Sequence, residues 1–131
     1  TIQRRWTLQS RYQRCYAGVL KQLRPLLLDP TVSIQNSAAL ALGRVANHSP
    51  DLAEAVVTNE VLPQLVMSLA QQSVFYKKAA CFVLRSVAKH SSALAKCIVS
   101  SGAIDSLAVC MEEFDPGVKE SAAWALACIA K

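Results

Sequence analysis

The sequence repeats itself every 42 residues, and this period constrains the fold more than any other feature of the chain. Shifting the sequence by 42 and then by 84 residues aligns a row of small and aliphatic residues with itself. The matched sets are Ala38, Leu42, Val45 and Ala46; Ala80, Leu84, Val87 and Ala88; and Ala122, Leu126, Ile129 and Ala130. His48-Ser49 likewise matches His90-Ser91. We therefore expect the 131 residues to form one array of similar units.

The spacing of apolar residues within each copy predicts helices. Residues four, seven and eight positions apart lie on one side of a helix. A long third helix is predicted at about 34–47, 76–89 and 118–131, a second helix at 19–28, 61–70 and 103–112, and a short first helix at 50–58 and 92–100. Asn59, Gly102 and Pro116 stand where these helices are expected to end or begin.

A unit of three helices cannot bury its own apolar side, so neighbouring units are expected to stack. This predicts an all-α fold, a right-handed α-solenoid of about two and a half to three 42-residue repeats, with the third helices lining one long face. The segment from Val118 to Ala130 resembles the third helix of armadillo repeats, and Ser101–Ile104 resembles their turn into the second helix. The resemblance implies an armadillo array.

The repeat register also divides the chain. We expect a single armadillo-repeat fragment over 1–131, with a basic, divergent arm at 1–16, an incomplete first repeat at 17–47, a second at 48–89 and a third at 90–131. The residues that match Leu52, Ala53, Val56 and Val57 are Ser10, Arg11, Arg14 and Cys15. Because three of these four are polar, no normal short helix is expected to dock there. The chain also lacks an initial Met, which indicates a piece of a longer protein.

The net charge of +5 is concentrated at one end of the chain. Residues 1–24 carry six basic groups and no acidic group, whereas residues 25–131 carry eight basic and nine acidic groups. The body therefore lacks the basic face that nucleic-acid binding requires. No apolar run approaches the roughly 18 residues of a membrane-spanning helix. We predict neither a nucleic-acid partner nor a membrane partner.

The reactive side chains do not form a pattern typical of an enzyme. His48 and His90 share one repeat position, which favours a structural role at the end of a helix. The five cysteines form no Cys-x-x-Cys pair and are expected to be reduced thiols of a cytosolic protein. Cys81, Cys97, Cys110 and Cys128 have apolar neighbours and are expected to be buried. The sequence shows no phosphate-binding loop, nucleophile elbow or catalytic carboxylate pair, so we predict no enzymatic activity, no cofactor and no metal site.

The outward side of the third helices is the candidate binding surface. The residues predicted to form this protein-binding groove are Asn36, Leu40, Arg44, Lys78, Phe82, Arg85, Lys89 and Trp124. An apolar row of Leu40, Phe82 and Trp124, flanked by basic residues, could hold an extended protein segment. The alternative is that Leu40 and Phe82 only cover adjacent repeats.

The groove differs from that of one armadillo subfamily, the nuclear-import adaptors. Those proteins pair a groove tryptophan with an asparagine one turn later. The corresponding pairs here are Leu40/Arg44, Phe82/Ser86 and Trp124/Cys128, and the asparagine is absent each time. Basic side chains in the groove would also repel a basic segment. Capture of a basic peptide is therefore not expected.

Several segments carry a closer resemblance. They are Leu23–Asp29, Ala38–Arg44, Asp51–Val57, Leu62–Val66, Phe75–Ala80, Phe82–Arg85 and Phe114–Glu120. These segments are similar to the N-terminal repeats of a family of armadillo proteins from the central apparatus of motile cilia and flagella. The resemblance implies a cytoskeletal scaffold of the axoneme that is required for motility and associated with axonemal proteins and microtubules.

Three other modes of binding stay open at this point. The chain could be a junctional, signalling or transport adaptor that binds an extended acidic, aromatic peptide in its groove. Residues 1–24 could attach directly to an acidic polymer, meaning the tails of tubulin or a nucleic acid. Exposed ends of the solenoid could also mediate self-association.

Overall fold

The computed structural model describes the backbone of residues 2–69 and 73–131 and the side chains of residues 14–69 and 73–131. These parts hold eight helices and no strand. The helices are α1 Ile2–Leu26, α2 Val32–His48, α3 Pro50–Thr58, α4 Val61–Leu69, α5 Val74–Ala88, α6 Ser92–Ser100, α7 Ala103–Met111 and α8 Pro116–Ala130. None of these helices alone is long and apolar enough to cross a membrane; only α6 and α7 taken together pass that test, and they meet at a bend of 77°.

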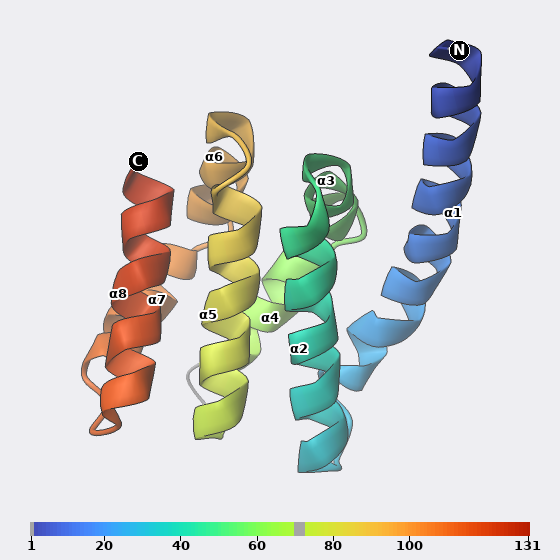
Figure 1. Ribbon diagram of the computed structural model, residues 1–131. Coiled ribbons are helices and arrows are strands. Elements are labelled where there is room, and N and C mark those ends of the chain that lie inside the picture. The colour runs from blue at the N-terminus through green and yellow to red at the C-terminus, as the bar shows by residue number, and fades with distance from the viewer. Residues whose placement is uncertain (1, 70–72) are drawn as a thin grey trace.

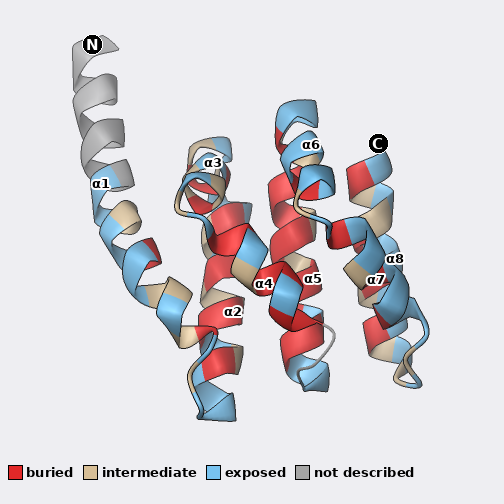
Figure 2. Cartoon of the chain, turned by 180° about the vertical axis from the view of Figure 1, so that it is seen from behind, coloured by how far each residue is buried: buried red, intermediate tan, exposed pale blue. Residues whose placement is uncertain are grey.

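The helices stack as an α-solenoid. The long helices α2, α5 and α8 lie side by side in one row, with α2 packed against α5 and α5 against α8 (Figure 1). Helices α4 and α7 lie behind this row, as the reverse view shows (Figure 2). The predicted short first helices have the observed bounds of α3 and α6, whereas α2, α5 and α8 each begin two residues before the predicted position. The all-helical solenoid predicted from the sequence is confirmed.

Side-chain caps explain where four of the helices begin. Ser49, Ser73, Ser91 and Asp115 precede α3, α5, α6 and α8. Each side-chain oxygen accepts a hydrogen bond from the backbone N–H three residues later, over 3.0 to 3.2 Å. Such caps satisfy an N–H that has no partner within the helix and contribute about 1 kcal/mol each. The caps at Ser73 and Asp115 start α5 and α8 ahead of their first predicted core residues.

The core follows the 42-residue register. Ala38, Ala80 and Ala122 occupy one repeat position, and each is at most 2% exposed. Their small side chains let adjacent long helices approach closely. Leu42 and Leu84 are fully buried in the same hydrophobic core. The stacking of units, rather than any single repeat, therefore creates the core.

The first repeat departs from the prediction. Helix α1 continues without a break from Ile2 to Leu26, so the second helix predicted at 19–28 is wrong at its N-terminal boundary. Arg14 matches Val56, which is fully buried in α3, yet Arg14 is exposed. Without an apolar side to dock, this segment does not fold back as α3 and α6 do, and the N-terminal half of α1 projects beyond the stack (Figure 1).

The turn between the first and second helices suggests a stabilising substitution. Gly102 has a φ of 84°, and Glu60, at the same repeat position, has a φ of 59°. A residue with a side chain pays a steric cost in this left-handed region. We expect Glu60→Gly to raise the free energy of unfolding by about 1 kcal/mol, measured by urea denaturation. The lost ion pair with Arg24 is mostly solvent-exposed and should contribute little.

The matched control is Glu54→Gly, at an exposed position inside α3. This change should lower the free energy of unfolding by about 1 kcal/mol, because glycine is unfavourable within a helix. Equal destabilisation by both substitutions would contradict the claim that the Glu60 backbone is strained.

Candidate functional site

A cleft of about 310 Å³ lies between the third helices α5 and α8. It is lined by Lys78, Cys81, Phe82 and Arg85 from α5 and by Gly117, Glu120, Ser121 and Trp124 from α8. The spacing of three, four and seven residues places each set on one side of its helix. Both walls of the cleft therefore come from the third helices of consecutive repeats.

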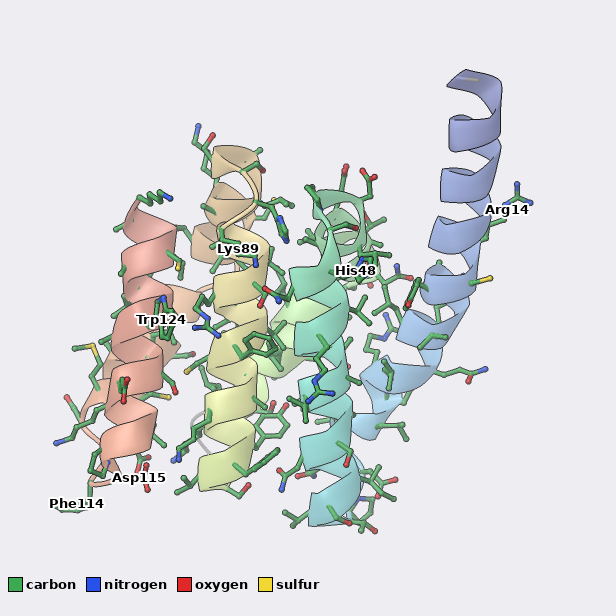
Figure 3. The ribbon with its side chains drawn as sticks, in the orientation of Figure 1. Arg14, His48, Lys89, Phe114, Asp115 and Trp124 are labelled. Atoms are coloured by element: carbon green, nitrogen blue, oxygen red, sulfur yellow. The ribbon has the colours of Figure 1, made fainter. Side chains whose placement is uncertain are left out.

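Arg85 is held between two aromatic rings at the centre of this cleft. Its guanidinium carbon lies 4.0 Å from the centroid of the Trp124 ring and 5.1 Å from that of Phe82. Cation–π contacts at such distances contribute about 0.5 to 2 kcal/mol each. Trp124 lies on the side of α8 that faces α5 and is 56% exposed (Figure 3). The two repeats thus share one cationic and aromatic cluster that is open to solvent.

Phe82 also packs against the preceding repeat. A Cβ atom added to Gly43 would lie 2.3 Å from the Phe82 ring, so only glycine at this position in α2 accepts the ring. The half-buried ring therefore covers the neighbouring repeat, as the alternative interpretation of the sequence holds, and also lines the cleft.

One end of the cleft is formed by Lys78 and the start of α8. The Lys78 Nζ lies 3.7 Å from Asp115 Oδ1, the same carboxylate that caps α8. The lysine side chain passes over Gly117, where a Cβ atom would lie 2.5 Å from its Cε. Glycine at this position therefore makes room for the lysine, and Asp115 fixes its charged end beside the cleft.

The other groove residues predicted from the sequence do not line this cleft. Asn36 Oδ1 accepts a hydrogen bond from Ser73 Oγ at 3.2 Å, and Lys89 Nζ donates to Asn47 Oδ1. Leu40 is half-buried and Arg44 is exposed. Asn36 and Lys89 therefore join adjacent repeats through side chains that remain accessible to solvent.

Four residues that line the cleft are not in the predicted set: Cys81, Gly117, Glu120 and Ser121. Cys81 lies four residues before Arg85, and Ser121 lies three residues before Trp124. Extending the helical spacing from the predicted residues Arg85 and Trp124 would have found Cys81 and Ser121. Gly117 is recognisable only from the position of the Lys78 side chain.

A second, larger cavity of about 860 Å³ lies between the end of α1 and α4. Leu28 and Met67 contribute exposed apolar surface, and an ion pair joins Arg24 to Glu60 at 3.7 Å. None of the residues predicted for the groove lines this cavity.

Comparison with known sequences supports the resemblance seen in the repeats. No family model matches the chain. Sperm-associated antigen 6 of mouse is 67% identical over 54 residues, which are 41% of this chain and 11% of the mouse protein. The human protein is 65% identical over 54 residues, with the same coverage. The chain is therefore similar to sperm-associated antigen 6 but spans only 11% of the length of these curated relatives.

Comparison with solved structures addresses the fold. A designed armadillo repeat protein in complex with the peptide (KR)4 superimposes with a TM-score of 0.82 at 24% sequence identity. The match covers 86% of this chain and 47% of the designed protein. This chain has the armadillo-repeat fold. In armadillo terms, the cleft lies between the third helices of two consecutive repeats.

A histidine links two armadillo repeats. The His90 Nε2 donates a hydrogen bond of 2.8 Å to the backbone oxygen of Ala46, near the carboxyl end of α2. The structural role predicted for this histidine is therefore confirmed. Within the described side chains, no group of three or more His, Cys, Asp or Glu residues is placed to hold a metal ion.

The thiols of the armadillo array differ in their exposure to solvent. Cys81 and Cys110 are buried, and Cys128 is half-buried. Cys97 is exposed, so the prediction that it is buried is wrong: the outer side of the short helix α6 is not covered. A hydrogen bond with the Cys110 thiol and burial both raise the pKa of the Cys81 thiol. Cys81 therefore carries little of the reactive thiolate at neutral pH.

This difference predicts the order of thiol alkylation. In native protein, iodoacetamide should modify Cys15 and Cys97 about 100-fold faster than Cys81 and Cys110, as measured by peptide mass spectrometry over time. In denaturing urea, all of these thiols should react at similar rates. Modification of native Cys81 as fast as Cys97 would contradict the burial of α5 against α7.

Proposed function

We propose that this chain is a non-enzymatic protein-interaction scaffold that holds an extended segment of another protein along its third helices. The observation that carries the proposal is the solvent-open cluster of Phe82, Arg85 and Trp124 between two repeats. Aromatic and arginine side chains that are fixed before binding are typical of interface hot spots. A designed protein of the same fold is known in complex with a peptide, which supports this use of the fold.

The cellular part of the proposal is a role in the central apparatus of motile cilia and flagella, in association with microtubules. Its support is the identity of 67% over 54 residues with sperm-associated antigen 6 of mouse. Immunostaining of ciliated cells and sperm should place the protein along the axoneme. Staining confined to cell junctions or nuclei would contradict this role and favour an adaptor of another pathway.

Binding to isolated, salt-washed axonemes tests the scaffold function. The Trp124→Ala substitution should weaken co-sedimentation of the chain with axonemes about tenfold, because the exposed aromatic anchor is lost. The matched control is Phe114→Ala, which removes an aromatic ring that is 98% exposed and does not line the cleft (Figure 3). Equal loss of binding in both variants would contradict a specific role of the cleft.

A second candidate surface is the projecting helix α1. Residues 1–24 carry six basic groups and no acidic group, and the helix extends beyond the stack (Figure 1). A basic arm of this kind suits an acidic polymer such as the tubulin tails. Deletion of residues 1–16 should then weaken microtubule co-sedimentation at low salt, with a smaller effect at high salt. Binding that survives the deletion at both salt concentrations would contradict this candidate.

Self-association through the solenoid ends is a separate proposal. The apolar side chains of Val99, Ile104 and Met111 are 37% to 50% exposed in the third repeat. The counterparts of Ile104 and Met111 in the second repeat, Leu62 and Leu69, are at most 3% exposed because the third repeat covers them, whereas Val57, the counterpart of Val99, is half-buried. Light scattering of the isolated chain should therefore detect association that increases with protein concentration; a monomer at all concentrations would contradict it.

A further inference from the structure

We propose that the cleft between α5 and α8 is a subsite for one acidic side chain, a glutamate or aspartate carried by the extended segment of the partner protein. The proposal rests on the scaffold function above and specifies the chemistry of its partner. Two basic side chains converge on the cleft. Lys78 and Arg85 both line it from α5, and Glu120 is the only acidic residue in its described lining.

Arg85 is the residue of the subsite that is available to bind a carboxylate. Among the described side chains, no carboxylate lies within 4.0 Å of its guanidinium group as an ion-pair partner. Phe82 and Trp124 lie against this group at ring distances of 5.1 and 4.0 Å. The rings fix the orientation of the guanidinium plane and exclude water from part of it, which strengthens a bond to an incoming carboxylate.

The shape of the cleft suits a carboxylate on a short aliphatic stem. A carboxylate can accept two parallel N–H bonds from arginine, and the Trp124 ring offers an apolar surface for the methylene groups of the stem. Lys78 adds a second positive charge two helical turns before Arg85, and Asp115 neutralises only part of it at 3.7 Å. Glu120 also lines the cleft but forms no ion pair with Arg85 or Lys78, so a basic side chain would meet the unpaired positive charge of Arg85 at this place. Charge complementarity therefore selects an acidic occupant.

The test uses the full 131-residue chain and three fluorescently labelled peptides, (ES)4, (QS)4 and (KS)4, in anisotropy titrations at low ionic strength. We expect (ES)4 to bind at least about tenfold more tightly than (QS)4, and (KS)4 to bind most weakly. Arg85→Gln should reduce the affinity for (ES)4 about tenfold. Arg85→Lys should cause an intermediate loss, since lysine keeps the charge but not the bidentate, stacked geometry.

The matched control is Lys96→Gln, which removes one positive charge from an exposed position on α6 outside the cleft. It should change the affinity for (ES)4 less than twofold. Equal losses in Arg85→Gln and Lys96→Gln would overturn the subsite and indicate a diffuse charge effect. Circular dichroism and thermal melting of both variants establish that the fold is kept.

The remaining outcomes separate the subsite from the scaffold function. If (QS)4 or (KS)4 binds the unaltered chain as tightly as (ES)4, the acidic preference is overturned, whereas axoneme binding that depends on Trp124 would still support the scaffold. Failure of all three peptides to bind also overturns the subsite. If Trp124→Ala leaves axoneme binding unchanged, the scaffold function of the cleft fails, whatever the peptides show.

Discussion

Truncation of Leu84 to alanine is expected to lower the free energy of unfolding by about 3 to 4 kcal/mol. Leu84 is fully buried where α5 packs into the core of the stack. The substitution removes apolar contacts and leaves a cavity that rigid neighbouring helices fill only in part. Because both flanking repeats pack against α5, the loss should appear in the unfolding of the whole array. Urea denaturation followed by circular dichroism measures the change.

The chain provides a control at the same repeat position. Leu126 in α8 matches Leu84 but is only half-buried. Leu126→Ala makes the same chemical change, yet it should cost about 1 to 2 kcal/mol, since less apolar area is removed from contact. A cost for Leu126→Ala equal to or larger than that for Leu84→Ala would mean that burial in the middle of the stack does not determine stability.

The fold was predictable because one period governs both helix formation and packing. The residues that repeat every 42 positions include Ala38, Ala80 and Ala122, and all three lie in the core. Caps also have local signals: Ser49-Pro50 and Asp115-Pro116 mark the starts of α3 and α8. After α1, the largest shift is at the starts of the long helices, which begin two residues early; side-chain caps at Ser73 and Asp115 account for α5 and α8, whereas α2 has no such cap.

In the first repeat the 42-residue pattern no longer predicts the structure. Arg14 and Cys15 replace residues that dock in the second repeat, so the pattern indicates that normal docking is lost. It does not indicate what the chain does instead. Gly18 lies at the position where Gly102 turns, yet α1 continues through Gly18 as a helix. The turn therefore depends on a docked first helix and not on glycine alone.

The candidate site was predictable only as a set of positions. Helical spacing placed Phe82, Arg85 and Trp124 on one face, but not the stacking of Arg85 between the two rings. The contact of Phe82 with Gly43 joins residues 39 positions apart and depends on how closely α2 approaches α5. Such contacts follow from packing between repeats, which the periodicity of one repeat does not encode.

Lys77 is a second feature that the periodic pattern did not reveal. Its side chain is 9% exposed and forms an ion pair with Glu113, which follows α7 in the next repeat and is 30% exposed. Removing a charged nitrogen from water is costly unless a partner compensates for the lost hydration. The Glu113 carboxylate supplies that compensation, so the pair couples the second repeat to the third.

Glu113→Gln is therefore expected to lower the free energy of unfolding by about 2 kcal/mol, because it leaves the buried Lys77 charge without its counter-ion. The cost should lie below that of a fully buried pair, since Glu113 is partly exposed. The double variant Lys77→Met with Glu113→Leu should recover most of the loss, because no unpaired charge remains buried. Urea denaturation of the unaltered chain, Glu113→Gln and the double variant measures the three free energies of unfolding.

Glu112→Gln is the matched control, since it makes the same change at an exposed residue next to Glu113. It should alter the free energy of unfolding by less than about 0.5 kcal/mol. If Glu113→Gln costs no more than Glu112→Gln, the ion pair does not hold the two repeats together. If instead the double variant is as unstable as Glu113→Gln, removal of the buried charge does not restore stability, which would contradict the explanation by an unpaired Lys77 charge.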